Sequence, residues 1–331
     1  MSSVPAWPPL LEQLLQGRDL DGEQATALME GWLSERIEPP LTGALLAAVL
    51  RRACPLPGSR PPLPLVDTCG TGGDGADSFN ISTAVAFTAA ACGAHVAKHG
   101  NRSASGRVGS ADVLEALGIH LQAPQDQVIA ALPEAGLTFL FAPGWHPALV
   151  GLAPLRRSIG VRTVFNLLGP LVNPLRPEAQ VLGVARADLL DPMAEALARL
   201  GLKRAVVVHG HGGLDEASLS GPSALRLVEN GSVRSEWLDP LSLGLEPAPL
   251  EALAGGDLAA NRLLLEQVLR GAGTSAQRDV VALNTALVLW AAGLFDSPEA
   301  ALSPALEALA SGAAWQRLER LRQALPTPSA G

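Results

Sequence analysis

The sequence predicts an α/β protein: a small all-helical domain plus a larger α/β domain with a mixed, mainly parallel sheet covered by helices. Two observations predict this fold class. Residues 10–53 have helical periodicity and few strand formers, and the chain after residue 63 alternates β-branched runs with helix-forming runs. Such alternation is typical of parallel sheets with helical crossovers. We therefore expect a helical domain at 1–62, joined by part of 165–190, and an α/β domain at 63–331.

The amino-terminal domain should contain three helices. They are predicted at 10–17, 21–35 and 39–53, where Gly, Asp and Pro mark the breaks. A proline-rich stretch at 54–64 follows. Because proline can neither continue a helix nor enter a central strand, we expect this stretch to connect the two domains.

Strands and helices should alternate in the larger domain. Strands are predicted at 63–69, 95–98, 137–143 and 205–209. Helices are predicted at 81–94, 110–118, 278–295 and 313–325. Residues 226–238 should form a hairpin, because Asn230-Gly231 is a strong two-residue turn.

Composition and charge exclude several classes of protein. The 331 residues carry a formal net charge of −8, which argues against a nucleic-acid-binding surface. No apolar run reaches the roughly 18 residues of a membrane helix, and the first residues lack the basic and apolar segments of a signal peptide. Cys54, Cys69 and Cys92 have no metal-type spacing. We expect a cytoplasmic protein with reduced thiols that binds neither nucleic acid nor membranes.

A glycine-rich loop, VDTCGTGGDG, follows the first predicted strand. Gly70, Gly72 and Gly75 match the dinucleotide pattern G-x-G-x-x-G, but the acidic residue that should follow about 20 residues later is missing, and that region is basic. Asp74 would repel a bare pyrophosphate unless a cation or a sugar hydroxyl lay between them. The loop therefore favours a phosphorylated sugar bound together with a metal ion.

Two further segments extend this phosphate site. Asn80, Ser82 and Thr83 lie where the next helix should start, and side-chain oxygens and free N–H groups there can bind phosphate. The loop after the second strand carries cations, hydroxyls and an amide: Lys98, His99, Asn101, Arg102, Ser103, Ser105, Arg107 and Ser110. A basic run is usually a solvated face. This one follows a strand, where ligands bind in open parallel sheets.

Asp215 and Glu216 form an adjacent carboxylate pair after the strand predicted at 205–209. Such a pair is often only surface charge. At the carboxyl end of a strand it can instead bridge Mg²⁺ to substrate phosphates, because Mg²⁺ prefers hard oxygen ligands. His209 and His211 lie nearby, but no third residue has the spacing of a zinc ligand.

Seven motifs together resemble the anthranilate phosphoribosyltransferases of tryptophan biosynthesis, a nucleoside phosphorylase class II-like glycosyltransferase family. They are DTCGTGGDG, FNIST, KHGNR, GSADVLEALG, RRSIGVRTVFNLLGPLVNP, GGLDE and RDVVALNTALVLW, and the resemblance spans roughly residues 10–293. It implies a homodimer formed through the helical domain. It also implies transfer of the 5-phosphoribosyl group from 5-phosphoribosyl 1-pyrophosphate (PRPP) to the amine of anthranilate, with Mg²⁺.

The resemblance also implies roles for individual residues. PRPP would contact Gly70, Gly73, Asp74, Ser78, Asn80, Ser82, Thr83, Lys98, Asn101, Arg102, Ser103, Ser105, Gly106 and Ser110. Anthranilate would contact Gly70, Asn101 and Arg156, and Mg²⁺ would be held by Ser82, Asp215 and Glu216. Lys98, His99, Asn101 and Arg156 would be the catalytic residues. A role for His99 as acceptor of the amine proton is a hypothesis based on its place between Lys98 and Asn101.

Two other functions remain open at this point. A pyrimidine nucleoside phosphorylase of the same fold would use phosphate in place of PRPP. The KHGNR and LDE runs argue against it, because metal carboxylates matter chiefly for a pyrophosphate. A non-catalytic relative that binds nucleic acid would need a basic surface, whereas this chain is acidic.

Overall fold

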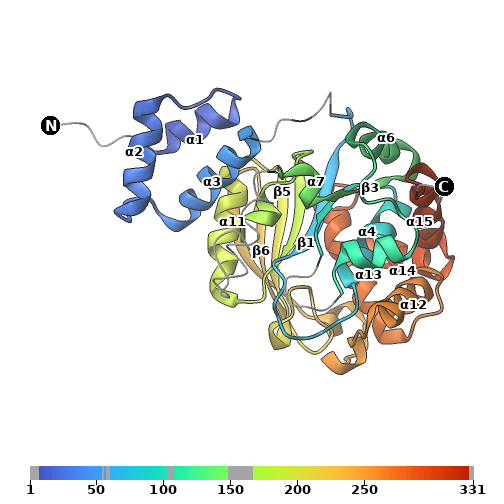
Figure 1. Cartoon of the computed structure of the whole chain (residues 1–331). Coiled ribbons are helices and arrows are strands. Elements are labelled where there is room, and N and C mark those ends of the chain that lie inside the picture. The colour runs from blue at the N-terminus through green and yellow to red at the C-terminus, as the bar shows by residue number, and fades with distance from the viewer. Residues whose placement is uncertain (1–6, 54–55, 57–59, 103–107, 148–166, 328–331) are drawn as a thin grey trace.

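The amino-terminal helices form a small group beside the rest of the molecule (Figure 1). The computed structural model describes residues 7–53, 56, 60–102, 108–147 and 167–327. The three helices are α1 (Trp7–Leu15), α2 (Gly22–Leu33) and α3 (Pro39–Ala53). Asp21 and Gln24 start α2 as a capping box, in which each side chain accepts a hydrogen bond from the other's backbone N–H. The three predicted helices are confirmed.

A seven-stranded sheet forms the larger part, with the order β3-β2-β1-β4-β5-β6-β7. The strands are β1 (Leu65–Gly70), β2 (His95–Gly100), β3 (Leu137–Phe141), β4 (Ala179–Gly183), β5 (Arg204–His209), β6 (Ser223–Glu229) and β7 (Ser232–Leu238). The first five strands pair in parallel, and β5, β6 and β7 pair antiparallel. The predicted fold class, a helical domain plus an α/β domain with a mixed, mainly parallel sheet, is confirmed.

Helices cover both faces of this sheet (Figure 1). One face carries α4 (Ile81–Ala91), α6 (Gln125–Ala135), α12 (Leu258–Leu269), α13 (Ser275–Ala291), α14 (Pro298–Ala310) and α15 (Ala313–Ala324). The short α5 (Ser110–Ala116) packs on α12, and α7 (Ala142–Trp145) follows β3 directly. The other face carries α11 (Leu190–Arg199), on which α3 packs. The short 3-10 helices η1 (Gly169–Leu171), η2 (Ala187–Leu189), η3 (His211–Gly213), η4 (Pro240–Leu243) and η5 (Leu250–Leu253) lie in connections.

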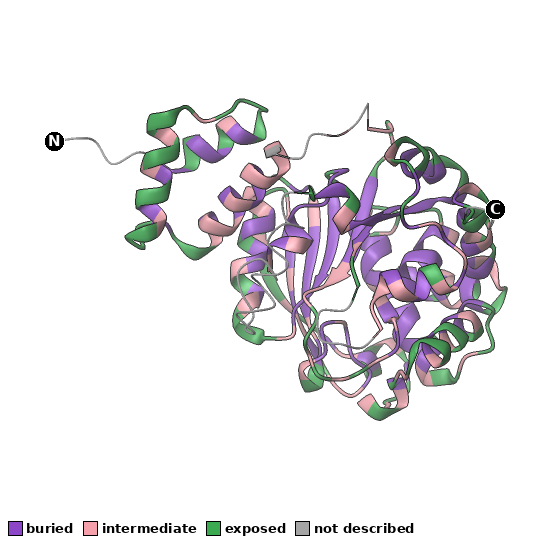
Figure 2. Ribbon diagram, in the orientation of Figure 1, coloured by how far each residue is buried: buried purple, intermediate pink, exposed green. Residues whose placement is uncertain are grey.

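Two hydrophobic clusters lie on the two faces of the sheet. Alternate residues of β5 point to different clusters: Val206 and Val208 to the larger one, Ala205 and Val207 to the smaller one. The smaller cluster continues into α1, α2 and α3, so these helices share one core with α11. Figure 2 shows the buried residues running through the sheet and the helices against it.

Several elements differ from the sequence prediction. β4 and the helices α6, α11, α12 and α14 were not predicted, although β4 lies in the middle of the sheet. The hairpin of β6 and β7 is confirmed: Glu229 pairs with Ser232, and Asn230 and Gly231 have φ of 48° and 82°. Among the described residues, none of the helices combines the length and apolar character that a membrane crossing requires. Cys69 and Cys92 are free thiols.

Candidate active site

The glycine-rich loop leaves β1 at Gly70 and reaches α4 at Ile81. Gly72, Gly73 and Gly75 have positive φ, between 64° and 75°, a conformation that favours glycine. Gly70 is glycine for another reason, because a Cβ there would collide with the carboxylate of Asp215. Gly70 pairs with Gly183 of β4, where a Cβ would collide with the backbone of Asp215. The loop and the ends of β1 and β4 therefore pack directly against Asp215.

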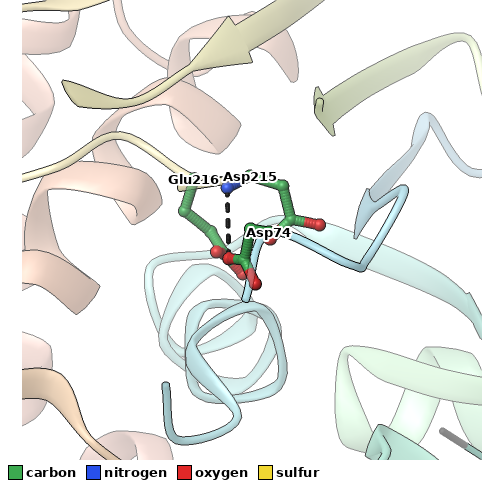
Figure 3. A group of neighbouring side chains, drawn as sticks. All are labelled: Asp74, Asp215 and Glu216. Carbon is green, nitrogen blue, oxygen red and sulfur yellow. Dashed lines mark hydrogen bonds between the residues drawn. The ribbon is translucent and has the colours of Figure 1, made fainter. Parts of the chain in front are cut away.

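Three carboxylates meet at the carboxyl ends of β1 and β5 (Figure 3). One ligand atom from each of Asp74, Asp215 and Glu216 lies within 4.8 Å of the others. The Asp215 carboxylate accepts from Gly72 N at 2.7 Å, and the Asp74 carboxylate accepts from Asp215 N at 3.5 Å. Glu216 Oε2 is buried and has no hydrogen-bond partner among the described residues. The arrangement explains why the glycine-rich loop carries an aspartate: Asp74 joins the carboxylate pair after β5.

Burial and nearby negative charge raise the pKa values of the two adjacent carboxyl groups, Asp215 and Glu216. Burial and the charge of Asp74 raise the pKa of Asp215 to about 6. Burial and the neighbouring Asp215 raise the pKa of Glu216 well above its usual range. A divalent cation bound among the three carboxylates would favour their ionised forms. Glu216 Oε2, which has no hydrogen-bond partner among the described residues, would then be one of its ligands. The donor set, all hard oxygens, fits Mg²⁺.

Lys98 points from β2 toward this acidic group. Its side chain is buried, and Nζ donates to Thr68 O at 2.7 Å and to Ser82 Oγ at 3.1 Å. Burial lowers the pKa of Lys98, while Asp67 and the metal-site carboxylates oppose that change. The structure thus brings together Lys98 and Ser82, from β2 and the first turn of α4, as the sequence motifs suggested.

His99 is buried against a second histidine. Its Nδ1 lies 3.1 Å from Gly169 O, and its ring meets that of His146 edge to face with centroids 5.1 Å apart. Since a carbonyl oxygen only accepts, Nδ1 carries the proton. Burial and the neighbouring His146 lower the pKa of His99 to about 3, and Nε2 has no partner among the described residues. His99 is therefore neutral near pH 7, and its role as proton acceptor stays a prediction.

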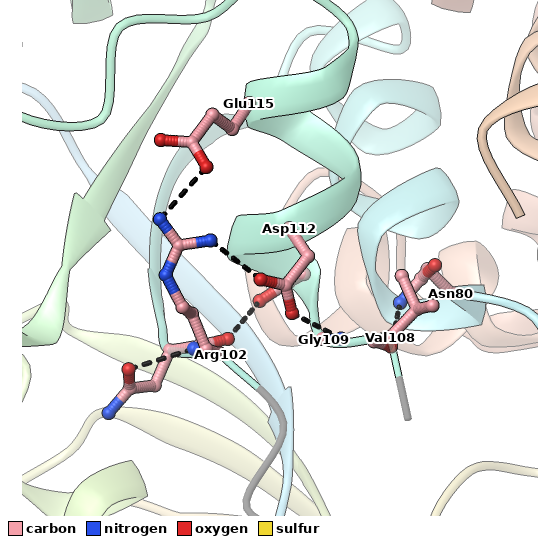
Figure 4. Close-up of polar contacts among 8 residues, drawn as sticks. Asn80, Arg102, Val108, Gly109, Asp112 and Glu115 are labelled. Carbon is pink, nitrogen blue, oxygen red and sulfur yellow. Dashed lines mark hydrogen bonds and ion pairs between the residues drawn. The ribbon is translucent and has the colours of Figure 1, made fainter. Parts of the chain in front are cut away.

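Asn80 links the glycine loop to the loop after β2. It occupies the N-cap position of α4, but its side chain makes no capping hydrogen bond. Instead Nδ2 donates to Val108 O at 3.1 Å (Figure 4). Asn80 Oδ1 and Thr83 Oγ1 are buried without partners among the described residues. Thr83 is fully buried in α4, so of these two residues only the half-buried Asn80 reaches the surface of the site.

Arg102 is paired with acidic residues of α5 rather than left open. Its guanidinium contacts Asp112 at 2.6 Å and Glu115 at 2.8 Å (Figure 4). It also lies over the Phe141 ring, 5.5 Å from the centroid. Asn101 is exposed, and its Oδ1 accepts from Arg102 N at 2.8 Å. The assignment of Arg102 to PRPP stays a prediction. To bind PRPP, the guanidinium would have to break one of these ion pairs or contact the ligand through its solvent-exposed side.

The remaining predicted residues fall into two groups. Gly73 is exposed in the loop, Ser78 forms an antiparallel bridge with Ala254, and Ser110 Oγ donates weakly to Asn101 O at 3.4 Å. Ser103, Ser105, Gly106, Arg107 and Arg156 lie outside the described residues.

Sequence reasoning missed a buried polar network beneath the site. Asp67 is fully buried in β1. Its carboxylate accepts hydrogen bonds from His99 N at 3.2 Å and from Asn173 Nδ2 at 2.9 Å. Asn173 Nδ2 also donates to Ala97 O at 2.7 Å. Burial raises the pKa of Asp67 to about 6. One signal of this network was present in the sequence: Asp67 is an ionisable residue inside the apolar run of a predicted strand, where a charged group needs buried partners.

Comparison with known proteins agrees with this geometry. The model of the glycosyl transferase family, a/b domain, matches residues 63–315, and that of the helical bundle domain matches residues 8–52. The anthranilate phosphoribosyltransferase of Prochlorococcus marinus (strain MIT 9313) is 66% identical over 336 residues, which cover 97% of this chain and 96% of the relative. That of Synechococcus sp. (strain CC9311) is also 66% identical, covering 97% of each.

Solved structures show the same architecture. The crystal structure of anthranilate phosphoribosyltransferase from Thermus thermophilus has a TM-score of 0.81 and 42% identity, covering 96% of this chain and 99% of that one. The Saccharomyces cerevisiae enzyme in complex with PRPP and Mg has a TM-score of 0.80 and 26% identity, covering 97% and 93%. On this sequence identity and shared fold, the chain belongs to the anthranilate phosphoribosyltransferase family.

Proposed function

We propose that this protein is a magnesium-dependent anthranilate phosphoribosyltransferase. It transfers the 5-phosphoribosyl group of PRPP to the amine of anthranilate and releases pyrophosphate, a step of tryptophan biosynthesis. The observation that carries the proposal is the cluster of Asp74, Asp215 and Glu216 beside the buried Lys98, in a chain 66% identical to enzymes of that name. The Saccharomyces cerevisiae relative in complex with PRPP and Mg supports the same substrate and metal.

The charged residues act on the leaving group. Asp74, Asp215, Glu216 and Ser82 would hold Mg²⁺, which when bound neutralises charge on the departing pyrophosphate. Lys98 provides a further positive charge next to Ser82, which lies in the first turn of α4, where the helix N-terminus favours an anion. Because charge develops on the pyrophosphate as the bond to C1 breaks, these donors stabilise the transition state more than the ground state.

The residues on the other side hold the attacking amine. We assign Gly70, Asn101 and Arg156 to anthranilate, because the first two lie at the carboxyl ends of β1 and β2 and a guanidinium can pair with the anthranilate carboxylate in two hydrogen bonds. An aromatic amine is unprotonated near neutral pH, so it needs placement rather than activation. No covalent enzyme intermediate is required.

The proposal extends to assembly and location. We divide the chain into a helical domain at 1–62, joined by part of 165–190, and an α/β domain at 63–331. Leu171, in the 165–190 segment, shares one hydrophobic cluster with α3, which supports joining part of this segment to the helical domain. We also propose a cytoplasmic homodimer formed through the helical domain, where Met29 and Leu33 of α2 are exposed apolar side chains.

One assay tests the function. The purified protein is mixed with PRPP, Mg²⁺ and anthranilate, and loss of anthranilate fluorescence is followed. We expect loss that needs all three components and that stops on addition of a chelator. A folded protein that leaves the fluorescence unchanged, or that instead cleaves uridine in the presence of inorganic phosphate, contradicts the proposal.

A further inference from the structure

Asn284 holds the backbone directly after the two adjacent carboxylates. It lies in α13, and its side chain is 3% exposed. Its Oδ1 accepts from Ala217 N at 2.8 Å, and its Nδ2 donates to Ala217 O at 2.9 Å. Both backbone groups of one residue are thus bound by a single side-chain amide. Ala217 follows Glu216 in the chain, so the clamp acts one residue away from the metal-site pair.

The helix that carries this amide is itself fixed. Nearly all of α13 is buried, and it packs on β1, β4, β5 and α4, the elements that present the rest of the site. A third hydrogen bond, from Asn284 Nδ2 to Val280 O at 2.9 Å, sets the orientation of the amide within its own helix. The donors and the acceptor of the side chain are therefore all used, and the position of Ala217 is tied to the core.

The carboxylate pair is constrained on its other side as well. In the preceding turn Gly210 N donates to Leu214 O at 2.8 Å, and Gly213 N donates to Gly210 O at 3.0 Å. A Cβ at Gly210 would collide with Glu216 O, which shows how closely the turn packs on the pair. Asp215 and Glu216 therefore sit between a tight turn and the Asn284 clamp.

The Glu216 side chain interacts with Asp215 next to it, so the place of the pair relative to the rest of the site depends on this backbone. Glu216 Oε2 is buried without a hydrogen-bond partner among the described residues. Asn284 also lines the small cavity that Ser82, Asp215 and Glu216 line. A shift of the Ala217 backbone would move the Glu216 carboxylate relative to Asp74 and Ser82, which come from a different part of the chain.

We propose that Asn284 is a positioning residue for the metal-binding carboxylates. By binding both backbone groups of Ala217, it sets the distance between the Asp215–Glu216 pair and Asp74, and so the affinity of the site for a divalent cation. The inference rests on the proposed function for the use of that cation in phosphoribosyl transfer. Residues that orient metal ligands typically contribute 10–100-fold to metal affinity or activity.

The test compares Asn284→Leu, which has a similar size and no hydrogen bonds, with Thr138→Val. Thr138 is a buried residue of β3 whose Oγ1 donates to Val128 O at 2.6 Å, away from the carboxylates. Mn²⁺ binding to the full chain without substrate is measured by electron paramagnetic resonance, and the melting temperature is recorded for each protein. Phosphoribosyl transfer is measured over a range of Mg²⁺ concentrations.

We expect Asn284→Leu to bind Mn²⁺ at least about tenfold more weakly than the wild type and to need more Mg²⁺ for half-maximal rate. Thr138→Val should keep the wild-type Mn²⁺ affinity even if its melting temperature falls. Wild-type affinity in Asn284→Leu, with only a lower melting temperature, would overturn the proposal. If this variant does not fold, Asn284→Ser, which leaves room for water at Ala217, takes its place with the same two outcomes.

The result separates this inference from the proposed function. If the wild type transfers no phosphoribosyl group but Asn284→Leu loses Mn²⁺ affinity, the clamp stands and the function fails. If the wild type is active and Asn284→Leu keeps its Mn²⁺ affinity, the function stands and the clamp fails.

Discussion

At the scale of single residues, close packing around Asp215 leaves no room for a side chain at Gly70. The backbone there has no positive φ, so any residue could adopt its conformation. The restriction comes from the carboxylate of Asp215, whose position a Cβ would take. Gly70 is therefore a glycine because of what lies next to it, whereas Gly72 and Gly75 are glycines because of their backbone angles.

A Gly70→Ala variant should lose much of its activity while remaining folded. The added methyl group displaces the Asp215 carboxylate from Gly72 N and from its place opposite Asp74. We expect kcat/KM to fall by about tenfold or more. Initial rates and circular dichroism check this, with Gly22→Ala as the control, since a Cβ at Gly22 meets nothing within 4 Å. Wild-type rates in Gly70→Ala would show that the close approach is dispensable.

His99 should make the stability of the protein depend on pH in the acidic range. Its pKa is about 3 when folded and about 6.5 when unfolded, so below pH 6.5 the unfolded chain binds a proton that the folded chain does not. The contribution of His99 to the free energy of unfolding should then fall with falling pH, by about 1.4 kcal/mol per pH unit between about pH 6 and pH 4, whereas the raised pKa values of Asp67 and Asp215 act in the opposite direction in both proteins compared below. The other charges that act on His99 remain in both proteins compared below: His146, whose ring contacts it, and Lys98, the preceding residue of β2.

Urea unfolding at several pH values measures this contribution. The slope of the free energy of unfolding against pH should be smaller for His99→Gln than for the wild type. The difference should be about 1.4 kcal/mol per pH unit, which corresponds to one proton. The exposed His211→Gln serves as the control and should keep the wild-type slope. Parallel curves for the wild type and His99→Gln would mean that His99 takes up its proton in the folded state as readily as in the unfolded chain.

The sequence predicted some of these residues and not others, for a physical reason. Asp74, Lys98, Ser82, Asp215 and Glu216 are polar residues in loops, at strand ends or at a helix start, where their chemistry is visible from the sequence. Asp67, Asn173 and Asn284 act through backbone groups far away in sequence, and only tertiary structure reveals those partners. Within the apolar run of α13 the sequence could indicate that Asn284 is a buried amide, but not that its partner is Ala217.

At the scale of elements, the ends of parallel strands were predicted better than the centre of the sheet. The runs of β1, β2, β3 and β5 stood out because turn residues or polar motifs follow them. β4 was missed, since its five residues, AQVLG, form no alternating pattern. Its place between β1 and β5 nevertheless determines the site, because it sets the spacing of the Gly70 and Asp215 segments.

The position of Lys98 within β2 places its ammonium group beside Ser82, where we propose that it acts on the leaving group. Replacing it by methionine keeps the apolar stem but removes the charge beside Ser82. We expect kcat to fall by about 10²–10³-fold, the usual effect of losing one donor that stabilises a developing negative charge. The change in KM should be smaller, because the metal-site carboxylates remain.

Steady-state kinetics of Lys98→Met test this, with Lys203→Met as a matched control. Lys98 and Lys203 are the two lysines of the chain, and Lys203 is exposed before β5. Lys203→Met should retain the wild-type kcat. A kcat for Lys98→Met within about twofold of the wild type would exclude Lys98 from charge neutralisation.

At the scale of the whole molecule, the helical part and the α/β part are joined through the smaller hydrophobic cluster. This cluster contains Leu45 of α3, Leu171 of η1 and Leu197 of α11. Arg51 adds a polar contact, in which its Nε donates to Leu171 O at 3.1 Å. The sequence predicted the helical part correctly. It did not predict α11, so only the structure shows that this helix lies between the sheet and α3.

The apolar residues that α2 exposes give the last prediction, which concerns assembly. Met29 and Leu33 lie one helical turn apart, and Leu33 is 81% exposed. If the proposed homodimer forms through these helices, covering such side chains contributes to its stability.

The double variant Met29→Glu and Leu33→Glu would bury two charges per subunit in the interface and should dissociate the dimer. Light scattering after size exclusion should then give about 34.1 kDa, where the wild type gives about twice that mass. Trp237→Glu, at the 74% exposed tryptophan of β7, is the control and should remain dimeric. A doubled mass that persists in the α2 variant, or that is lost in Trp237→Glu, would place the dimer contact elsewhere.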